Sequence, residues 1–174
     1  VKITKRKIVE VLARLGYVDA VPAIGKCLWS DDVYLVENTV WSLQILKCQD
    51  HVLIEKMIDI LQRDLANQRV IIQCMASLDV HESVDVIHPF QFSSVPGIKG
   101  AAISAIANLT RNCERVSEIS LNLLLPNQMD RHFAVQDLID VNAIDQIAEI
   151  FSSPVSPAFK LRAVRNLYGD NIVD

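Results

Sequence analysis

Apolar residues recur at helical spacing along the whole chain. In the segment 31–46, the residues Val36, Val40, Leu43 and Leu46 follow one another at intervals of three or four positions, as in a helix that packs one face on a core. No segment shows the sustained alternation of apolar and polar residues that strands require. The pattern therefore predicts an all-α fold. The predicted helices cover residues 4–15, 20–28, 32–47, 51–63, 67–78, 82–88, 95–110, 114–124, 128–139, 143–151 and 157–168.

The longer helices can be aligned with one another at a period of about thirty residues. The aligned positions are Leu12, Leu43, Leu78, Leu109, Leu138 and Leu167. A period that holds two helices indicates stacked hairpins, because one hairpin cannot bury its own apolar face. We therefore predict an α-solenoid of about five HEAT-like helical hairpins, with a concave groove lined by the longer helices. A globular helical bundle is the alternative.

The alignment also predicts domain organisation and core. Residues 1–174 are interpreted as a single HEAT-like repeat domain, trimmed from a longer protein because the chain begins with Val1 rather than Met. Pro89 is predicted to end a helix early, with residues 90–92 in an extended bend. The residues predicted to be buried are Val36, Val40, Leu43, Cys74, Leu78, Ala105, Leu109, Leu138, Val164 and Leu167.

A second stripe runs along the helix predicted at 32–47. Tyr34, Glu37, Asn38 and Trp41 recur at helical spacing on a face other than the apolar one. An aromatic ring, a carboxylate, an amide and an indole along one ridge indicate a site. In the alternative interpretation Trp41 belongs to the core and Glu37 is merely solvated. Either Asp31 or Asp32 is placed to cap the N-terminus of this helix.

The repeat alignment extends this ridge into a ribbon along the predicted groove. Its further members are Arg6, Lys7, Glu10, Arg69, Gln73, Gly100, Ser104, His132, Gln136, Arg162 and Arg165. Because Gly100, Ser104 and Ala107 are small, the groove is expected to be roomiest in the middle. Arginines lie towards both ends, which suits an elongated ligand with anionic ends. A polar concave face that binds no small molecule is the alternative.

Composition narrows the function classes. The net charge of −4 opposes a role in neutralising phosphates, so no nucleic-acid partner is expected. No apolar run approaches the ~20 residues of a membrane span. The four cysteines are widely spaced, without a C-x-x-C motif or a neighbouring histidine. They are predicted to be reduced structural thiols that bind no metal, which favours a reducing, cytoplasmic location.

The segment 36–43, after an Asp-Asp turn, resembles the HEAT-like repeats of the E/F-type phycobilin lyases of cyanobacteria. The period of about thirty residues and the ending of the last helix, residues 163–170, are similar to that family too. The resemblance implies attachment of a linear tetrapyrrole, such as phycoerythrobilin, to a cysteine of a phycobiliprotein subunit. Phycoerythrin is the acceptor it suggests, and some relatives also isomerise phycoerythrobilin to phycourobilin during attachment. The bilin is then a substrate rather than a tightly bound cofactor, and a second lyase subunit is a further expected partner.

The resemblance gives the ribbon residues chemical roles. Arg69, Arg162 and Arg165 are the expected partners of the bilin propionates, and Trp41 and Tyr34 offer flat faces to the pyrrole rings. Glu37, Tyr34 and His132 are the candidates for proton transfer during thioether formation and isomerisation. The predicted ligand-binding set is completed by Asn38 and Gln73. The competing hypothesis is a non-catalytic HEAT-repeat scaffold whose concave face binds another protein.

Overall fold

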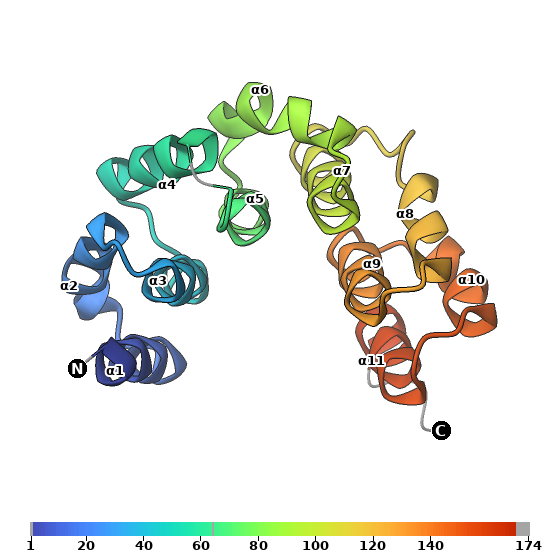
Figure 1. Ribbon diagram of the computed structural model, residues 1–174, viewed down its shortest axis with the longest axis horizontal. Helices are drawn as coiled ribbons and strands as arrows, with labels where there is room; N and C mark the ends of the chain where they lie inside the picture. Colours follow the sequence, from blue (N-terminus) through green and yellow to red (C-terminus); the bar gives the residue numbers. More distant parts are fainter. Residues whose placement is uncertain (1, 64, 170–174) are drawn as a thin grey trace. The chain divides into compact units, whose positions relative to one another are not determined.

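The computed structural model describes residues 2–63 and 65–169, and every regular element in this part of the chain is helical (Figure 1). Each predicted helix corresponds to a helical segment, and two of them, α4 and α11, have the predicted bounds. The α-helices are α1 Lys2–Arg14, α2 Val21–Gly25, α3 Val33–Ile45, α4 His51–Arg63, α5 Gln68–Ser77, α6 Val84–Ile87, α7 Pro96–Thr110, α8 Ser117–Leu121, α9 Gln128–Asp140, α10 Ile147–Ser152 and α11 Pro157–Tyr168.

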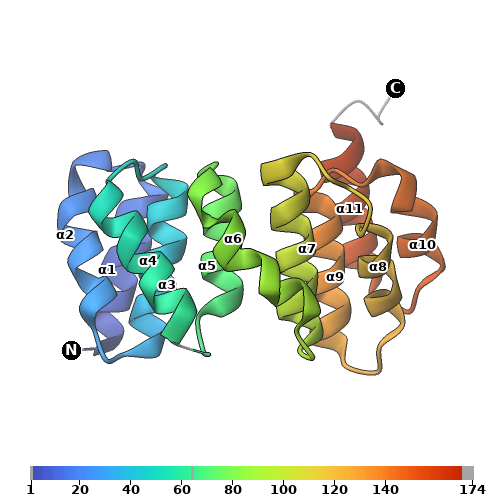
Figure 2. The same ribbon diagram turned by 90° about the horizontal axis from the view of Figure 1, so that it is seen from above.

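The chain divides into two compact units, Val1–Val86 and Ile87–Asp174. In the first unit α1, α3 and α5 form one layer, and the shorter α2 lies with α4 in a second layer (Figures 1 and 2). Helix α3 packs between α1 and α5, while α2 contacts α3 and α4 contacts α5. The fully buried side chains of this unit include Leu43, Met57, Ile71 and Met75. They lie on three helices of both layers, so neighbouring hairpins share one core.

The second unit repeats this arrangement. Helices α7, α9 and α11 form one layer, with α9 in contact with both of its neighbours, and α8 and α10 form the other (Figure 2). Its core joins residues of both layers, among them Ile119 of α8, Leu138 of α9 and Ile150 of α10, all fully buried. The predicted all-α fold of stacked helical hairpins is therefore confirmed within each unit. The interpretation of residues 1–174 as one domain stays a prediction.

The ends of helices α1, α3, α5 and α9 show the true repeat register. A residue of positive φ follows α1, α3, α5 and α9, namely Gly16, Lys47, Asp79 and Asn142. The next amide then donates to the carbonyl five positions back, which is the Schellman arrangement that satisfies a helix C-terminus. These bonds join Tyr17 to Leu12, Cys48 to Leu43, Val80 to Met75 and Ala143 to Leu138, at 2.9–3.1 Å.

Met75, rather than Leu78, is therefore the equivalent of Leu43, and the predicted alignment is wrong by three positions in that repeat. The error has a simple cause, because residues three positions apart share a helix face and both are apolar. Leu78 and Val164 are only half-buried, while the other eight residues predicted to be buried are so.

The predicted extended bend at residues 90–92 is also wrong. His88–Phe92 form a 3-10 turn that begins with Pro89 in its first turn, and Gln91 is buried. Proline interrupts an α-helix because it lacks an amide donor, yet it fits the first turn of a new helical segment. Pro89 therefore ends α6 and starts another helical turn rather than an extended one.

The four cysteines differ in exposure, and this predicts their order of reaction with a thiol reagent. All four are free; Cys48 and Cys74 are buried, Cys27 is half-buried and Cys113 is exposed. Burial raises the pKa of the Cys74 thiol and that of Cys48, and a protonated thiol is a poor nucleophile. In the native protein we expect Cys113 to react first, Cys27 more slowly, and the buried pair only on unfolding.

Thiol titration checks this order. In denaturant, four thiols of the parent should react. In the native protein, Cys113→Ser should remove the fast phase. Rapid reaction of all four thiols in the native protein would contradict the described packing.

An ion-pair cluster in the second unit predicts acid sensitivity. Glu118 accepts from Arg115 Nε at 2.7 Å and Nη2 at 2.9 Å, and Lys99 Nζ of α7 lies 3.0 Å from Oε2. The hydrogen bonds from Arg115 and then Lys99 lower the pKa of Glu118 to about 2. A carboxyl group with a lowered pKa stabilises the folded state at pH values above its ordinary pKa of 4.5. That stability is lost as the pH falls from 4.5 towards 2.

We therefore expect the melting temperature of Glu118→Gln to lie below that of the parent at pH 7. The gap should close between about pH 4.5 and pH 2. Thermal melts across this range measure it. A gap that stays constant down to pH 2 would show that the charge of Glu118 does not contribute.

Candidate functional site

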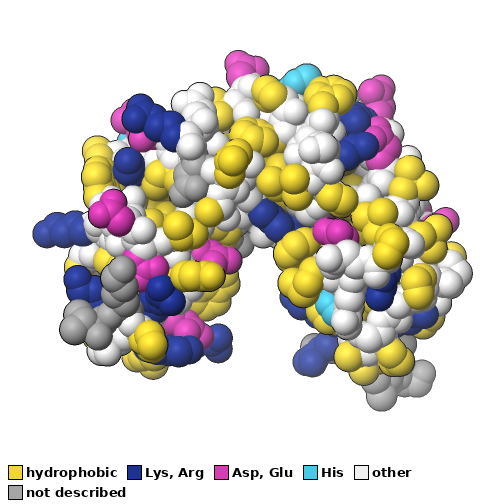
Figure 3. Space-filling model, viewed as in Figure 1, with side chains coloured by type: hydrophobic (Ala, Val, Ile, Leu, Met, Phe, Trp, Pro, Cys, Tyr) yellow, Lys and Arg dark blue, Asp and Glu magenta, His cyan; other side chains and the backbone are white. Residues whose placement is uncertain are grey.

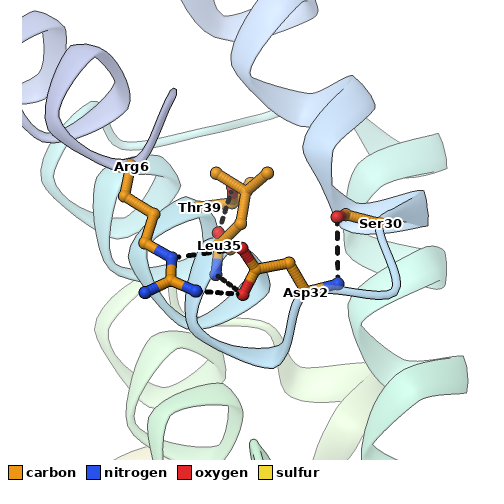
Figure 4. A network of polar contacts seen from close by, with 5 residues as sticks. All are labelled: Arg6, Ser30, Asp32, Leu35 and Thr39. Carbon is orange, nitrogen blue, oxygen red and sulfur yellow. Dashed lines mark hydrogen bonds and ion pairs between the residues drawn. The ribbon is translucent and has the colours of Figure 1, made fainter. Parts of the chain in front are cut away.

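The ridge of α3 is positioned by the residue that starts the helix. Asp32 is the N-cap, since its carboxylate accepts from the Leu35 amide at 3.4 Å. It also accepts from Arg6 of α1, with Nε 3.2 Å from Oδ2 and Nη2 bonded to Oδ1 (Figure 4). The Arg6 guanidinium holds the pKa of Asp32 below its usual range. This pair fixes α1 against the first turn of α3, from which the ridge residues follow.

The ridge predicted from the sequence lies at the surface. Tyr34 is 62% exposed, Glu37 is exposed, and Asn38 and Trp41 are half-buried. Trp41 is therefore not a fully buried core residue, in contrast to the alternative interpretation. The buried residues of α3 lie on its other faces, where Val36, Val40 and Leu43 pack as predicted.

Two arginines of α1 cover the aromatic rings of this ridge. The guanidinium carbon of Arg6 lies 4.8 Å from the centre of the Tyr34 ring, and that of Arg14 lies 5.6 Å from the Trp41 ring. Both distances are typical of cation–π contacts. In the space-filling view, basic and acidic side chains lie beside one another over α1 and α3 (Figure 3). Arg14 is absent from the predicted ribbon, although it follows Glu10 by one helical turn.

Arg69 and Gln73 are half-buried on α5, the helix that packs on α3. In the corrected register, with Met75 equivalent to Leu43, Arg69 corresponds to Glu37 and Gln73 to Trp41. They remain positions of the ridge face after the correction, because a shift of three residues keeps a residue on the same side of a helix.

The second unit brings other predicted residues together. The His132 ring of α9 stacks on Phe159 of α11, with ring centres 3.7 Å apart and planes within 7° of parallel. The Arg162 guanidinium lies 5.9 Å from the centre of the same phenyl ring and donates to Gln136 of α9. His132 Nε2 is buried and has no protein hydrogen-bond partner within the described residues. Phe159 was not predicted, because its role depends on contact between two helices.

Arg162 and Arg165 lie one turn apart on the exposed side of α11. They line a shallow depression of about 540 Å³ together with Ala158, Leu161, Asn166 and Gly169. This depression is lined by two cations beside the apolar side chains of Ala158 and Leu161, and its predicted preference for an anionic group stays a prediction. Asp170, the last residue of the motif at 163–170, lies outside the described residues.

The small residues in the middle of the predicted ribbon do not open a groove. Gly100, Ser104 and Ala107 are all buried on α7. A Cβ atom on Gly100 would collide with the carboxylate of Asp137 on α9, and one on Gly97 would lie 2.8 Å from the Phe133 ring. The expectation of a roomy middle is therefore wrong. The small residues let α7 and α9 approach closely. The space beside Gly97 and Gly100 is therefore filled by side chains of α9.

The predicted site residues divide between the two units. Tyr34, Glu37, Asn38, Trp41, Arg69 and Gln73 belong to the first unit, and His132, Arg162 and Arg165 to the second. A single groove that uses both sets stays a prediction, as does each residue's role. Within the described residues, no three His, Cys, Asp or Glu side chains gather closely enough to hold a metal ion. No helix in that part of the chain has the length and apolar character needed to cross a bilayer.

Comparison with known proteins finds relatives whose names refer to bilins. The chain is 75% identical over 171 residues to the bilin biosynthesis protein CpeY of Synechococcus sp. (strain WH8020), which covers 98% of this chain and 41% of that protein. It is 24% identical over 177 residues to the phycocyanobilin lyase subunit alpha of Nostoc sp. (strain PCC 7120), covering 94% of this chain and 63% of that one. These relatives confirm the resemblance to the E/F-type phycobilin lyases.

Two further comparisons agree with this resemblance. An uncharacterized phycocyanin operon protein Y of Pseudanabaena tenuis (strain PCC 7409) is 36% identical over 163 residues, covering 94% of this chain and 39% of that protein. The structure of the CpcE and CpcF complex of phycocyanin lyase from Nostoc sp. PCC7120 matches with a TM-score of 0.81 at 23% identity, over 93% of this chain and 65% of that one. This likeness shows a shared fold. No family model matches the sequence.

The chain spans about two fifths of the length of CpeY and of the phycocyanin operon protein.

Proposed function

We propose that the chain is part of a phycobilin lyase that attaches a linear tetrapyrrole of the phycoerythrobilin type to a cysteine of a phycobiliprotein subunit, with phycoerythrin as the acceptor. The observation that carries this proposal is the 75% identity, across nearly the whole chain, to a protein named for bilin biosynthesis. The exposed aromatic ridge beside cations supports it, because a bilin offers flat conjugated rings and two carboxylates.

The proposed reaction adds an S–H group across a double bond. The acceptor thiol loses its proton, its sulfur bonds to the exocyclic ethylidene carbon of ring A, and a proton is delivered to the tetrapyrrole. No oxidant is needed. Glu37 and Tyr34 are the candidates for these transfers on the first unit, where both are exposed. His132 is the candidate on the second unit, where stacking on Phe159 fixes the plane of its ring.

Ligand binding is assigned to the remaining predicted residues. Trp41 offers a stacking face, and Asn38 and Gln73 offer amide groups that donate and accept hydrogen bonds. The propionates are assigned to Arg69 in the first unit and to Arg162 and Arg165 in the second. Isomerisation to phycourobilin would move one proton from carbon to carbon, which the same acid and base groups can perform.

A second lyase subunit is part of the proposal. It is supported by the related structure, which is a complex of CpcE and CpcF. The competing function is a scaffold that binds another protein without chemistry, supported by the stacked-hairpin fold alone.

Mixing the purified protein with free phycoerythrobilin separates the two functions. A lyase component should give a red-shifted or fluorescent complex, because a bound bilin is held in one conformation. A scaffold should leave the spectrum of the bilin unchanged, and that result would contradict the proposal.

A further inference from the structure

The two arginines over the ridge aromatics are held in different ways. Arg6 makes two hydrogen bonds to Asp32, whose side chain is only 7% exposed. Arg14 is 67% exposed and bonds to Glu10 on its own helix, with Nη2 2.9 Å and Nε 3.1 Å from Oε1. One arginine is therefore anchored to another helix, and the other lies on the surface above an indole.

Displacing Arg6 would leave a buried carboxylate without its charged partner, which is strongly unfavourable. Arg6 therefore serves to fix α1 on α3 and is not available to a ligand. Arg6 is therefore not a candidate for binding a ligand carboxylate, although its guanidinium lies closer to an aromatic ring than the guanidinium of Arg14 does.

Arg14 can exchange its partner at little cost. An exposed ion pair one helical turn apart contributes little to stability. Glu10 also bonds to Lys7, whose Nζ lies 3.0 Å from Oε2. Lys7 is the larger cause of the lowered pKa of Glu10, followed by Arg14. When Arg14 turns to a ligand, Glu10 therefore stays paired with Lys7.

We propose that Arg14 and Trp41 form a subsite for one carboxylate-bearing ring of the tetrapyrrole. The pyrrole lies on the indole, and the guanidinium leaves Glu10 to pair with the propionate of that ring through two parallel N–H···O bonds. The inference rests on the proposed function and adds to it a binding residue that the sequence pattern did not reveal. The subsite lies within the first unit, to which Arg14, Glu10 and Trp41 all belong.

The test compares phycoerythrobilin with its dimethyl ester, which has the same rings but no carboxylates. Binding is followed by quenching of Trp41 fluorescence in a Trp29→Phe background, since Trp29 is the other tryptophan. Arg14→Gln should weaken binding of the diacid about tenfold and leave binding of the diester unchanged. Arg14→Lys keeps the positive charge but cannot form two parallel N–H···O bonds. Its affinity for the diacid should therefore lie between those of the parent and Arg14→Gln. The difference in diacid affinity between the parent and Arg14→Gln should shrink as salt is added.

Arg63 provides a matched control. It is 78% exposed and pairs with Asp59 one turn earlier on α4, with 2.6 Å between Nη2 and Oδ1. Arg63→Gln should therefore remove an equivalent surface pair without changing the affinity for either compound. Circular dichroism confirms that each variant is folded.

The outcomes distinguish the two levels of the proposal. Failure of the parent to bind phycoerythrobilin would contradict the proposed function itself. Binding by the parent with equal diacid affinity in Arg14→Gln would overturn the subsite alone. Equal losses for diacid and diester would do the same, because they would show that Arg14 acts through packing rather than through the carboxylate.

Discussion

Leu109→Ala is expected to lower the free energy of unfolding by about 2–5 kcal/mol. Leu109 is 4% exposed on α7, which packs on α9 in the second unit. Truncation removes buried methyl groups and leaves a cavity that rigid neighbouring helices fill only partly. Denaturant unfolding followed by circular dichroism measures the change.

Leu161→Ala supplies the matched control, because it removes the same atoms from a residue that is 70% exposed on α11. It should change the free energy of unfolding by less than about 0.5 kcal/mol. A similarly small effect at Leu109 would contradict the described packing of α7.

The second large effect is expected at the ridge. Glu37→Gln should slow bilin attachment by about a hundredfold if Glu37 transfers a proton, within the range for general acid–base catalysis. The side chain is exposed, and Gln forms helix about as well as Glu, so α3 should be unchanged. Trp41→Ala should reduce bilin retention as well, because it removes the stacking face and the platform beneath Arg14. Attachment rate and circular dichroism are measured for each variant.

Glu55→Gln is the control for Glu37, since Glu55 is an exposed carboxylate within α4. It should transfer bilin at the parent rate. If Glu37→Gln also folds normally and transfers at the parent rate, Glu37 has no chemical role and the proton-transferring group lies elsewhere.

Helical periodicity was sufficient to predict the helical segments of the described part of the chain, except the 3-10 turn at His88–Phe92. Repeated apolar spacing indicated the helices, and α4 and α11 lie at their predicted bounds. The register was harder to obtain, because Met75 and Leu78 are both apolar and three positions apart. The backbone hydrogen bond from Val80 to Met75 and the complete burial of Met75 distinguish them. Neither leaves a signal in hydrophobicity.

The same limit applies to the site. The ridge of α3 could be predicted because its residues are near one another in sequence and polar at a fixed spacing. Arg14 and Phe159 could not be found in this way, because each acquires its role from a helix distant in sequence. Gly100 shows the opposite error, since a small residue can mark either an open groove or a close helix contact. At Gly100 the nearby carboxylate of Asp137 on α9 shows that the small residue marks a close helix contact.

The most direct test of the central claim is co-expression of the chain, within its full-length protein, with phycoerythrobilin synthesis and phycoerythrin subunits, with and without a candidate second lyase subunit. The acceptor subunit is purified under denaturing conditions, so that only covalently attached bilin remains to absorb visible light. We expect a coloured acceptor subunit that depends on this protein and on an acceptor cysteine. An acceptor that binds this protein but stays colourless in every combination would contradict lyase function and favour the scaffold.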